Sequence, residues 1–122
     1  MGNLFQIHSH SRKIFGTAFR VPTQNVSVVD VALQLQKGAP KQTFEKVLRE
    51  YTEGKLKNII NFTQDDVVSS DFNHNPFSIN YDSKAGIFMK DNYVKMVGFF
   101  DNEWGYTNRI ADLLLRTIGG QQ

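Results

Sequence analysis

The sequence of 122 residues contains no cysteine, and this absence excludes three kinds of chemistry on the chain. Without a thiol there is no disulfide, no thiolate metal site and no cysteine nucleophile. The same absence does not indicate a cellular compartment, because cytosolic proteins can also lack cysteine.

Long apolar runs are missing as well. No run approaches the roughly 20 residues that a membrane-spanning helix needs, which excludes an integral membrane protein built on helices. Hydrophobic residues make up 40% and charged residues 21% of the sequence, which is typical of a globular protein. The length predicts one domain or less.

Acidic residues are absent before Asp30, although the net charge of the whole chain is only +2. A charge this balanced does not by itself argue for nucleic acid or an anionic membrane as a partner, and we expect no nucleic acid. The basic, serine-containing start leaves two interpretations open: an ordinary amino-terminal extension, or a mitochondrial targeting segment. We treat residues 1–15 as a divergent basic extension.

The first part of the sequence after this extension predicts two strands, at residues 17–21 and 26–35. Residues 22–25 include Pro22 and form the turn between them. The second strand is rich in β-branched residues, and its apolar side alternates with a more polar one. The apolar side is formed by Val31, Leu33 and Leu35.

A helix is predicted after Pro40, where apolar residues recur at helical spacing. Thr43 or a neighbour is expected to cap its start, and Gly54 suits the position just past its end. The stripe expected to face the core consists of Phe44, Val47, Leu48 and Tyr51.

A second helix is predicted at about residues 103–118, ended by Gly119 and Gly120. Asp112 and Arg116 are expected to form an i,i+4 ion pair on its outer side. Its inner stripe is predicted to consist of Ile110, Leu113, Leu114 and Thr117.

The remaining strands are predicted between the two helices. Their ranges are 59–62, 78–81, 84–89 and 93–100, with a hairpin turn at 90–92 and mostly loop at 69–77. Strands outnumber helices without βαβ alternation, so the predicted class is α+β.

Several segments of the sequence resemble signature stretches of phosphorylating glyceraldehyde-3-phosphate dehydrogenase, in the order and at the spacing of that family. The segments are residues 16–30 (GTAFRVPTQNVSVVD), 66–72 (DVVSSDF), 84–87 (KAGI), 93–95 (YVK) and 101–109 (DNEWGYTNR). The resemblance implies a partial catalytic domain at residues 16–118, followed by a tail at 119–122. It also implies a mixed, mostly antiparallel sheet with helices on one side and no Rossmann domain.

The resemblance gives roles to four residues. Arg20 corresponds to an arginine that binds phosphate, a task suited to the guanidinium fork. Asn102 corresponds to the asparagine that holds the nicotinamide carboxamide, while Tyr106 and Glu103 correspond to positions near that ring. The alternative interpretation is structural: Arg20 forms a surface ion pair, and Asn102 and Tyr106 begin and brace a helix.

The resemblance also shows what this chain does not supply for the reaction of that family. The mechanism needs a cysteine thiolate, activated by a histidine, that attacks the aldehyde before hydride passes to NAD. The sequence has no cysteine, and the family's catalytic histidine precedes the matching region, so His8, His10 and His74 are not assigned to catalysis. No Gly-x-Gly-x-x-Gly motif occurs, and two close histidines do not make a metal site. We therefore expect no catalytic residue, metal or cofactor on this chain alone, and NAD only where a partner completes the site.

Unpaired sheet edges are a further expectation, because the family's sheet includes strands from the upstream part. Such edges are expected beside residues 17–21 or 26–35, and an apolar edge aggregates unless it is covered. The leading hypothesis is a non-catalytic structural or accessory subunit whose edges are covered by other protein subunits. The alternative is the carboxy-terminal piece of a split dehydrogenase, completed by a cysteine-bearing chain. The family resemblance places the protein in the cytoplasm, with the mitochondrion as the alternative.

Overall fold

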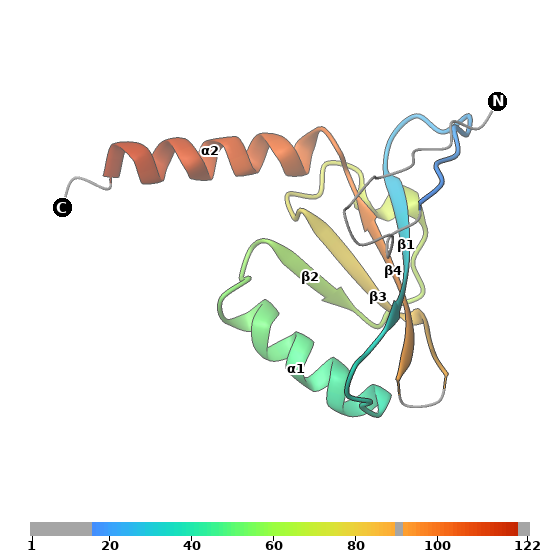
Figure 1. Cartoon of the computed structure of the whole chain (residues 1–122). Coiled ribbons are helices and arrows are strands. Elements are labelled where there is room, and N and C mark those ends of the chain that lie inside the picture. Colours follow the sequence, from blue (N-terminus) through green and yellow to red (C-terminus); the bar gives the residue numbers. More distant parts are fainter. Residues whose placement is uncertain (1–15, 90–91, 120–122) are drawn as a thin grey trace.

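A computed structural model describes residues 16–89 and 92–119 of the chain. The predicted hairpin residues Lys90 and Asp91 and the extension at 1–15 lie outside the described residues. The elements in chain order are β1 (Ser27–Gln34), α1 (Lys41–Glu53), β2 (Ile60–Thr63), the 3-10 helix η1 (Ser69–Phe72), β3 (Ile79–Met89), β4 (Tyr93–Phe100) and α2 (Trp104–Gly119). This is the predicted α+β class (Figure 1).

The strands form one sheet in the order β1-β4-β3-β2. β4 pairs antiparallel with both β1 and β3, whereas β2 pairs parallel with β3. The sheet is therefore mixed and mostly antiparallel, as the resemblance implies. β1 and β2 are its two edge strands within residues 16–89 and 92–119, which agrees there with the expectation of an unpaired edge beside residues 26–35.

The register of β1 on β4 places the predicted apolar side of β1 against apolar partners. Val31 lies opposite Met96 and Leu33 opposite Val94, while Ala32 lies opposite the basic Lys95. Because directly opposite residues share a face of the sheet, the alternation predicted from the sequence is confirmed.

β3 is a single strand, whereas the sequence predicted two strands separated by a gap at residues 82–83. The pairing with β4 shifts its register between Asp82 and Ile87, which marks a bulge. The Asp82 carboxylate accepts the N–H groups of Lys84 and Ala85 at 2.8 and 3.1 Å, and these bonds satisfy the backbone where the ladder is interrupted.

Helix α1 packs on the face of the sheet that carries Phe62 and Phe88. The Phe44 and Phe88 rings meet edge to face at 5.4 Å, and the Arg49 guanidinium lies 3.9 Å from the Phe62 ring centroid. The buried contact in between is polar: Ser83 Oγ donates to the Glu45 carboxylate at 2.6 Å. A stripe of apolar residues predicted this helix, but a buried carboxylate helps to hold it.

The ends of α1 agree with the sequence only in part. Gly54 is the C-cap, and its N–H donates to the carbonyl oxygens of Glu50 and Tyr51. The predicted start after Pro40 is confirmed, but the predicted side-chain cap is wrong: Pro40 itself occupies the N-cap, and Thr43 lies inside the helix without a capping bond. The expected inner stripe is only partly covered, because Val47 and Tyr51 remain 47% and 46% exposed.

The buried apolar core is small among the described residues. Val94 is fully buried, and Tyr81, Phe72 and Val26 are buried nearly as well. Phe72 comes from η1, which the sequence predicted as loop, and its ring stacks on Phe99 at 5.3 Å. Short 3-10 turns are common as connectors, and this one supplies an aromatic ring to the sheet.

The strand predicted at residues 17–21 is wrong, because this segment has no strand structure and its side chains are exposed. Among the described residues β1 pairs with β4 alone, and residues 17–21 do not pair with its other edge. A turn follows in which Thr23 N–H donates to the Val21 carbonyl at 2.8 Å.

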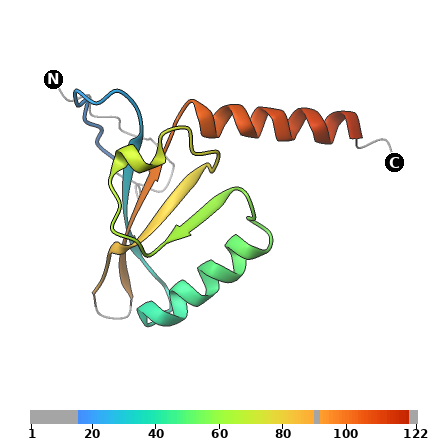
Figure 2. The same cartoon turned by 180° about the vertical axis from the view of Figure 1, so that it is seen from behind.

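Helix α2 leaves the end of β4 and extends away from the sheet, as both views show (Figures 1 and 2). Its predicted inner stripe is wrong: Leu113 and Leu114 are 65% and 56% exposed. The predicted ion pair of Asp112 with Arg116 is wrong too, because Asp112 pairs with Arg109 at 2.9 Å. Neither described helix is both long and apolar enough to cross a membrane.

Candidate functional site

Asp101 joins three separate segments of the chain at the point where β4 ends and α2 begins. Its side chain is buried, with the residue only 1% exposed. One carboxylate oxygen accepts the N–H groups of Glu103 and Trp104 at 3.1 and 2.9 Å. The other accepts Asn25 Nδ2 and the His74 N–H, each at 2.8 Å. The first pair caps α2, and the second pair ties two loops to its start.

The electrostatics of Asp101 favour its charged form. Burial alone would raise the pKa of this carboxyl, but the hydrogen bonds from Trp104, His74, Glu103 and Asn25 outweigh burial and lower the pKa below 3.8. A carboxylate is also the favoured charge at a helix N-terminus. Asp101 therefore holds this junction as an anion.

The three residues assigned to a nicotinamide site lie directly after this anchor. Asn102 and Glu103 are exposed in the turn before α2, and Tyr106 is 68% exposed in its first helical turn. Residues four apart share a helix face, so the spacing brings Asn102 and Tyr106 to the same side of the chain. The structure thus brings the three predicted residues together on an open surface.

Arg20 lies on the loop that precedes β1 and is exposed. Asn25, five residues further along, binds Asp101, so the Asp101 anchor also fixes the end of the Arg20 loop beside Asn102. Among the described residues no ion pair involves Arg20, which leaves the surface ion pair of the alternative interpretation without a partner there.

Sequence reasoning missed Asp101, Asn25 and the loop at His74. An aspartate directly before a predicted helix start is an N-cap signal, and it could have identified Asp101. No local signal predicts that Asn25, 76 residues away, donates a hydrogen bond to the Asp101 carboxylate. His74 has a positive φ of 57°, and its ring lies 5.1 Å from that of Trp104.

The described residues contain no group of three His, Asp or Glu side chains arranged to hold a metal ion. His8 and His10 lie outside the described residues.

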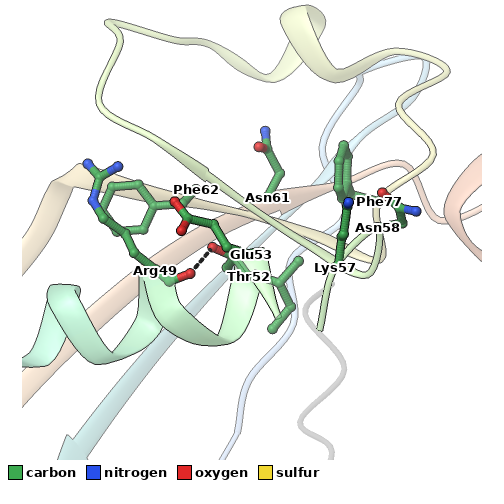
Figure 3. Close-up of a pocket in the computed structure, with 9 residues that line it drawn as sticks. Arg49, Thr52, Glu53, Lys57, Asn58, Asn61, Phe62 and Phe77 are labelled. Atoms are coloured by element: carbon green, nitrogen blue, oxygen red, sulfur yellow. Dashed lines mark hydrogen bonds between the residues drawn. The ribbon is translucent and has the colours of Figure 1, made fainter. Parts of the chain in front are cut away.

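A separate cavity of about 400 Å³ lies between α1 and the free edge of β2 (Figure 3). It contains none of the residues predicted for phosphate or cofactor binding. Its lining consists of Arg49, Thr52, Glu53, Lys57, Asn58, Ile60, Asn61, Phe62 and Phe77.

Comparison with known proteins identifies the family that this chain resembles. Residues 6–102 match the family described as "Glyceraldehyde 3-phosphate dehydrogenase, C-terminal domain". The chain is 53% identical over 102 residues to the glyceraldehyde-3-phosphate dehydrogenase of Podospora anserina, covering 84% of this chain and 30% of that protein. It is 50% identical over 103 residues to the cytosolic glyceraldehyde-3-phosphate dehydrogenase of Taxus baccata, with the same coverage of 84% and 30%.

The chain thus spans about a third of the length of the curated relatives it matches. The family match covers well over half of this chain, and it includes Arg20 and Asn102 and the strands between them. The chain belongs to the family of the glyceraldehyde 3-phosphate dehydrogenase C-terminal domain.

Proposed function

We propose that this chain acts as a non-catalytic structural or accessory subunit of a larger protein assembly. The observation that carries this proposal is the orientation of α2, which extends away from the sheet and leaves most of its apolar side chains exposed among the described residues. A chain with this surface needs a partner to cover it.

The contacts of α2 define which side faces the body. Arg109 Nη1 donates to the Asn58 carbonyl at 2.9 Å and lies 3.2 Å from Ser78 Oγ. A Cβ on Gly105, one turn earlier on this side, would lie only 2.8 Å from the Phe77 carbonyl oxygen. Gly105 and Arg109 therefore mark the side of α2 that packs against the body.

Two exposed apolar side chains point the other way, although Leu113, about 40° around the helix from Arg109, is exposed as well. At 3.6 residues per turn, Leu114 lies about 140° around the helix from Arg109, and Ile118 about 180°. These two residues are 56% and 79% exposed. A fully exposed leucine or isoleucine forgoes about 1.5–3 kcal/mol of burial, so a covering partner would gain substantially from this surface.

The sheet edges support the same proposal. In the part of the chain that the structure describes, β1 and β2 each pair on one side, and Val28 on β1 is 59% exposed. Open edges favour association with another polypeptide. The sequence adds that no cysteine is present for the family's covalent step.

A second candidate function is the carboxy-terminal piece of a split dehydrogenase. Its support is the exposure of Asn102 and Tyr106 on one side of a start of α2 that is held rigidly by Asp101. In this role another polypeptide supplies the cysteine, the histidine and the NAD-binding domain, and this chain contributes Asn102, Tyr106 and Arg20 to the completed site.

Native mass spectrometry of the chain purified from its own source tests the leading proposal. We expect the chain in a complex of defined mass with at least one other polypeptide. The Leu114→Gln variant should no longer be found in this complex. The Lys46→Gln variant, on the exposed surface of α1, should still be found in it. A wild-type chain that is folded and monomeric in its source would contradict the proposal.

A mixing experiment tests the second candidate. The chain is combined with the upstream two-thirds of the Podospora anserina relative, and NAD reduction is followed with glyceraldehyde 3-phosphate and phosphate. Activity above that of either piece alone, reduced about tenfold or more by Asn102→Ala, would support a split enzyme. No gain at saturating partner would exclude it.

Several relatives, including those of Taxus baccata and Sinapis alba, are named as cytosolic glyceraldehyde-3-phosphate dehydrogenases. We propose a cytoplasmic location on this ground. The mitochondrial alternative gains no support from these names.

A further inference from the structure

The outer edge of β2 carries main-chain groups that have no partner among residues 16–89 and 92–119. The Ile59 carbonyl accepts the N–H of Ser78 at 2.8 Å, so the main-chain groups of residue 59 point toward β3. The main-chain groups of successive residues point to opposite edges of a strand, so those of Ile60 and Phe62 point to the open side. The Ile60 N–H is satisfied by the Leu56 carbonyl at 3.1 Å. This leaves the Ile60 carbonyl and both main-chain groups of Phe62 facing outward in the described part of the chain.

Ile60 and Phe62 also line the cavity beside α1, which we call the β2-edge groove. In the view of Figure 3, Arg49 and Phe62 lie toward one end of the groove and Lys57 and Phe77 toward the other. Asn61 lies between them. The groove thus combines a strand edge with an aromatic ring at each end.

The charged lining of the groove is mainly basic. It contains Arg49, Lys57 and one acidic residue, Glu53. None of the three forms an ion pair within the described residues. The Arg49 guanidinium stacks at 3.9 Å from the Phe62 ring centroid, which holds its plane while leaving its N–H edges available. The surplus positive charge favours an acidic occupant.

We propose that the β2-edge groove binds an extended acidic segment of the partner polypeptide. The segment adds a strand to β2 through Ile60 and Phe62 and places a carboxylate at Arg49 or Lys57. Strand addition of this kind takes affinity from main-chain bonds and specificity from side-chain pockets. This inference rests on the proposed function, because it names the chemistry of the partner.

A second copy of this chain is a poorer occupant, since two such edges would bring Arg49 and Lys57 of both copies together. A small anion is also less suitable, because it offers no main chain to pair with the strand edge.

The test uses the full 122-residue chain, labelled with 15N, and the probe peptide acetyl-Val-Glu-Val-Glu-Val-amide. We expect saturable amide shifts at residues 60–63. A peptide with alternate amides N-methylated should bind about tenfold more weakly, because it cannot donate to the strand edge. The lysine counterpart, acetyl-Val-Lys-Val-Lys-Val-amide, should bind at least about fivefold more weakly.

Chain variants locate the charge. Arg49→Gln and Lys57→Gln should each weaken the binding of the acidic peptide about threefold or more. The matched controls Arg116→Gln and Lys46→Gln should leave its binding unchanged. Lys57 is exposed, so its variant keeps the test valid if Arg49→Gln does not fold. Equal binding of all three peptides, or shifts absent from residues 60–63, would overturn the proposal. Concentration-dependent dimerisation through this edge, or binding of benzoate as tight as that of the peptide, would overturn it as well.

The outcome separates this proposal from the proposed function. No peptide binding by a chain that still travels in a native complex would place the partner elsewhere and refute the groove alone. Peptide binding by a chain that is monomeric in its source would refute the subunit role alone.

Discussion

The two helices of this chain carry similar sequence patterns but meet opposite environments. α1 lies on the sheet, where Phe44 packs against Phe88 and Glu45 accepts a hydrogen bond from Ser83. Within the described residues, α2 contacts the body near its start, and its apolar side chains beyond Arg109 are exposed. Apolar periodicity therefore predicts that a helix forms and which side is apolar, but not what covers that side. The uncovered side of α2 is the difference that the proposed function explains.

The largest effect is expected at the anchor of α2. Asp101→Ala removes the acceptor of four hydrogen bonds and should lower the free energy of unfolding by about 2–4 kcal/mol in urea denaturation. The control Arg116→Ala, on the exposed part of α2, should change it by less than about 0.5 kcal/mol. A loss under about 1 kcal/mol at Asp101 would show that α2 is held by something else.

The same residue predicts a pH dependence. The pKa of Asp101 is lower in the folded chain than its ordinary 3.8, so its contribution is present above pH 3.8 and is lost as pH falls through the folded value. The free energy of unfolding should decrease below pH 3.8 in the wild type, and less steeply in Asp101→Asn. Parallel curves for the two proteins would contradict a charged Asp101.

The next effect concerns the polar contact that holds α1. Ser83→Ala removes the donor at 2.6 Å from the buried Glu45 carboxylate and should cost about 1–3 kcal/mol. Hydrogen exchange should accelerate in α1 and not in α2. Ser70→Ala on the exposed η1 is the control, and an equal cost there would remove any special role for the contact to Glu45.

A stabilising effect is expected at Tyr81 beneath α1. Its hydroxyl is buried without a hydrogen-bond partner among the described residues, so Tyr81→Phe should raise the free energy of unfolding by about 1 kcal/mol. Burial, together with the charges of Glu45 and Asp82, raises the pKa of Tyr81 to about 12.

The sign of the alkaline effect follows from this shift. The unfolded chain releases the Tyr81 proton near pH 10 while the folded chain retains it, so the wild type should lose stability between pH 10 and 12. Tyr81→Phe should lose less over this range, whereas the exposed Tyr93→Phe should behave as the wild type. A destabilised Tyr81→Phe protein would indicate a partner for the hydroxyl.

The smallest effect on stability compares the two apolar stripes directly. Leu113→Gln on α2 should change the free energy of unfolding by less than about 0.5 kcal/mol, because Leu113 is already 65% exposed. Leu48→Gln on α1 should cost about 1–2 kcal/mol, because Leu48 is half-buried. Equal costs in thermal or urea unfolding would mean that α2 is packed in solution as α1 is.

Local signals predicted much of this fold. The predicted range of β4 agrees with Tyr93–Phe100, and Gly54 ends α1 where its lack of a side chain suits the C-cap. The alternation in β1 predicted the face of Val31 and Leu33. In each case a short stretch of sequence contains the information, since turn residues and periodicity act over a few positions.

Contacts between segments that are far apart in the sequence could not be predicted from such local signals. The bulge in β3 depends on the Asp82 carboxylate bonding its own backbone instead of the ladder, so two predicted strands became one. The bond from Asn25 to Asp101 spans 76 residues and fixes the surroundings of Asn102. The direction in which α2 leaves β4 is decided by Gly105 and Arg109 against the body, which no periodicity encodes.

Amide hydrogen exchange of α2 tests the central claim most directly. In the purified chain, residues 110–118 should exchange far faster than the amides of β4, because little in the described structure packs on that half of the helix. In the native assembly the same amides should become protected about tenfold or more by the partner that covers Leu114 and Ile118. Protection of α2 in the purified chain equal to that of β4, unchanged in material from the source, would contradict a partner-binding surface.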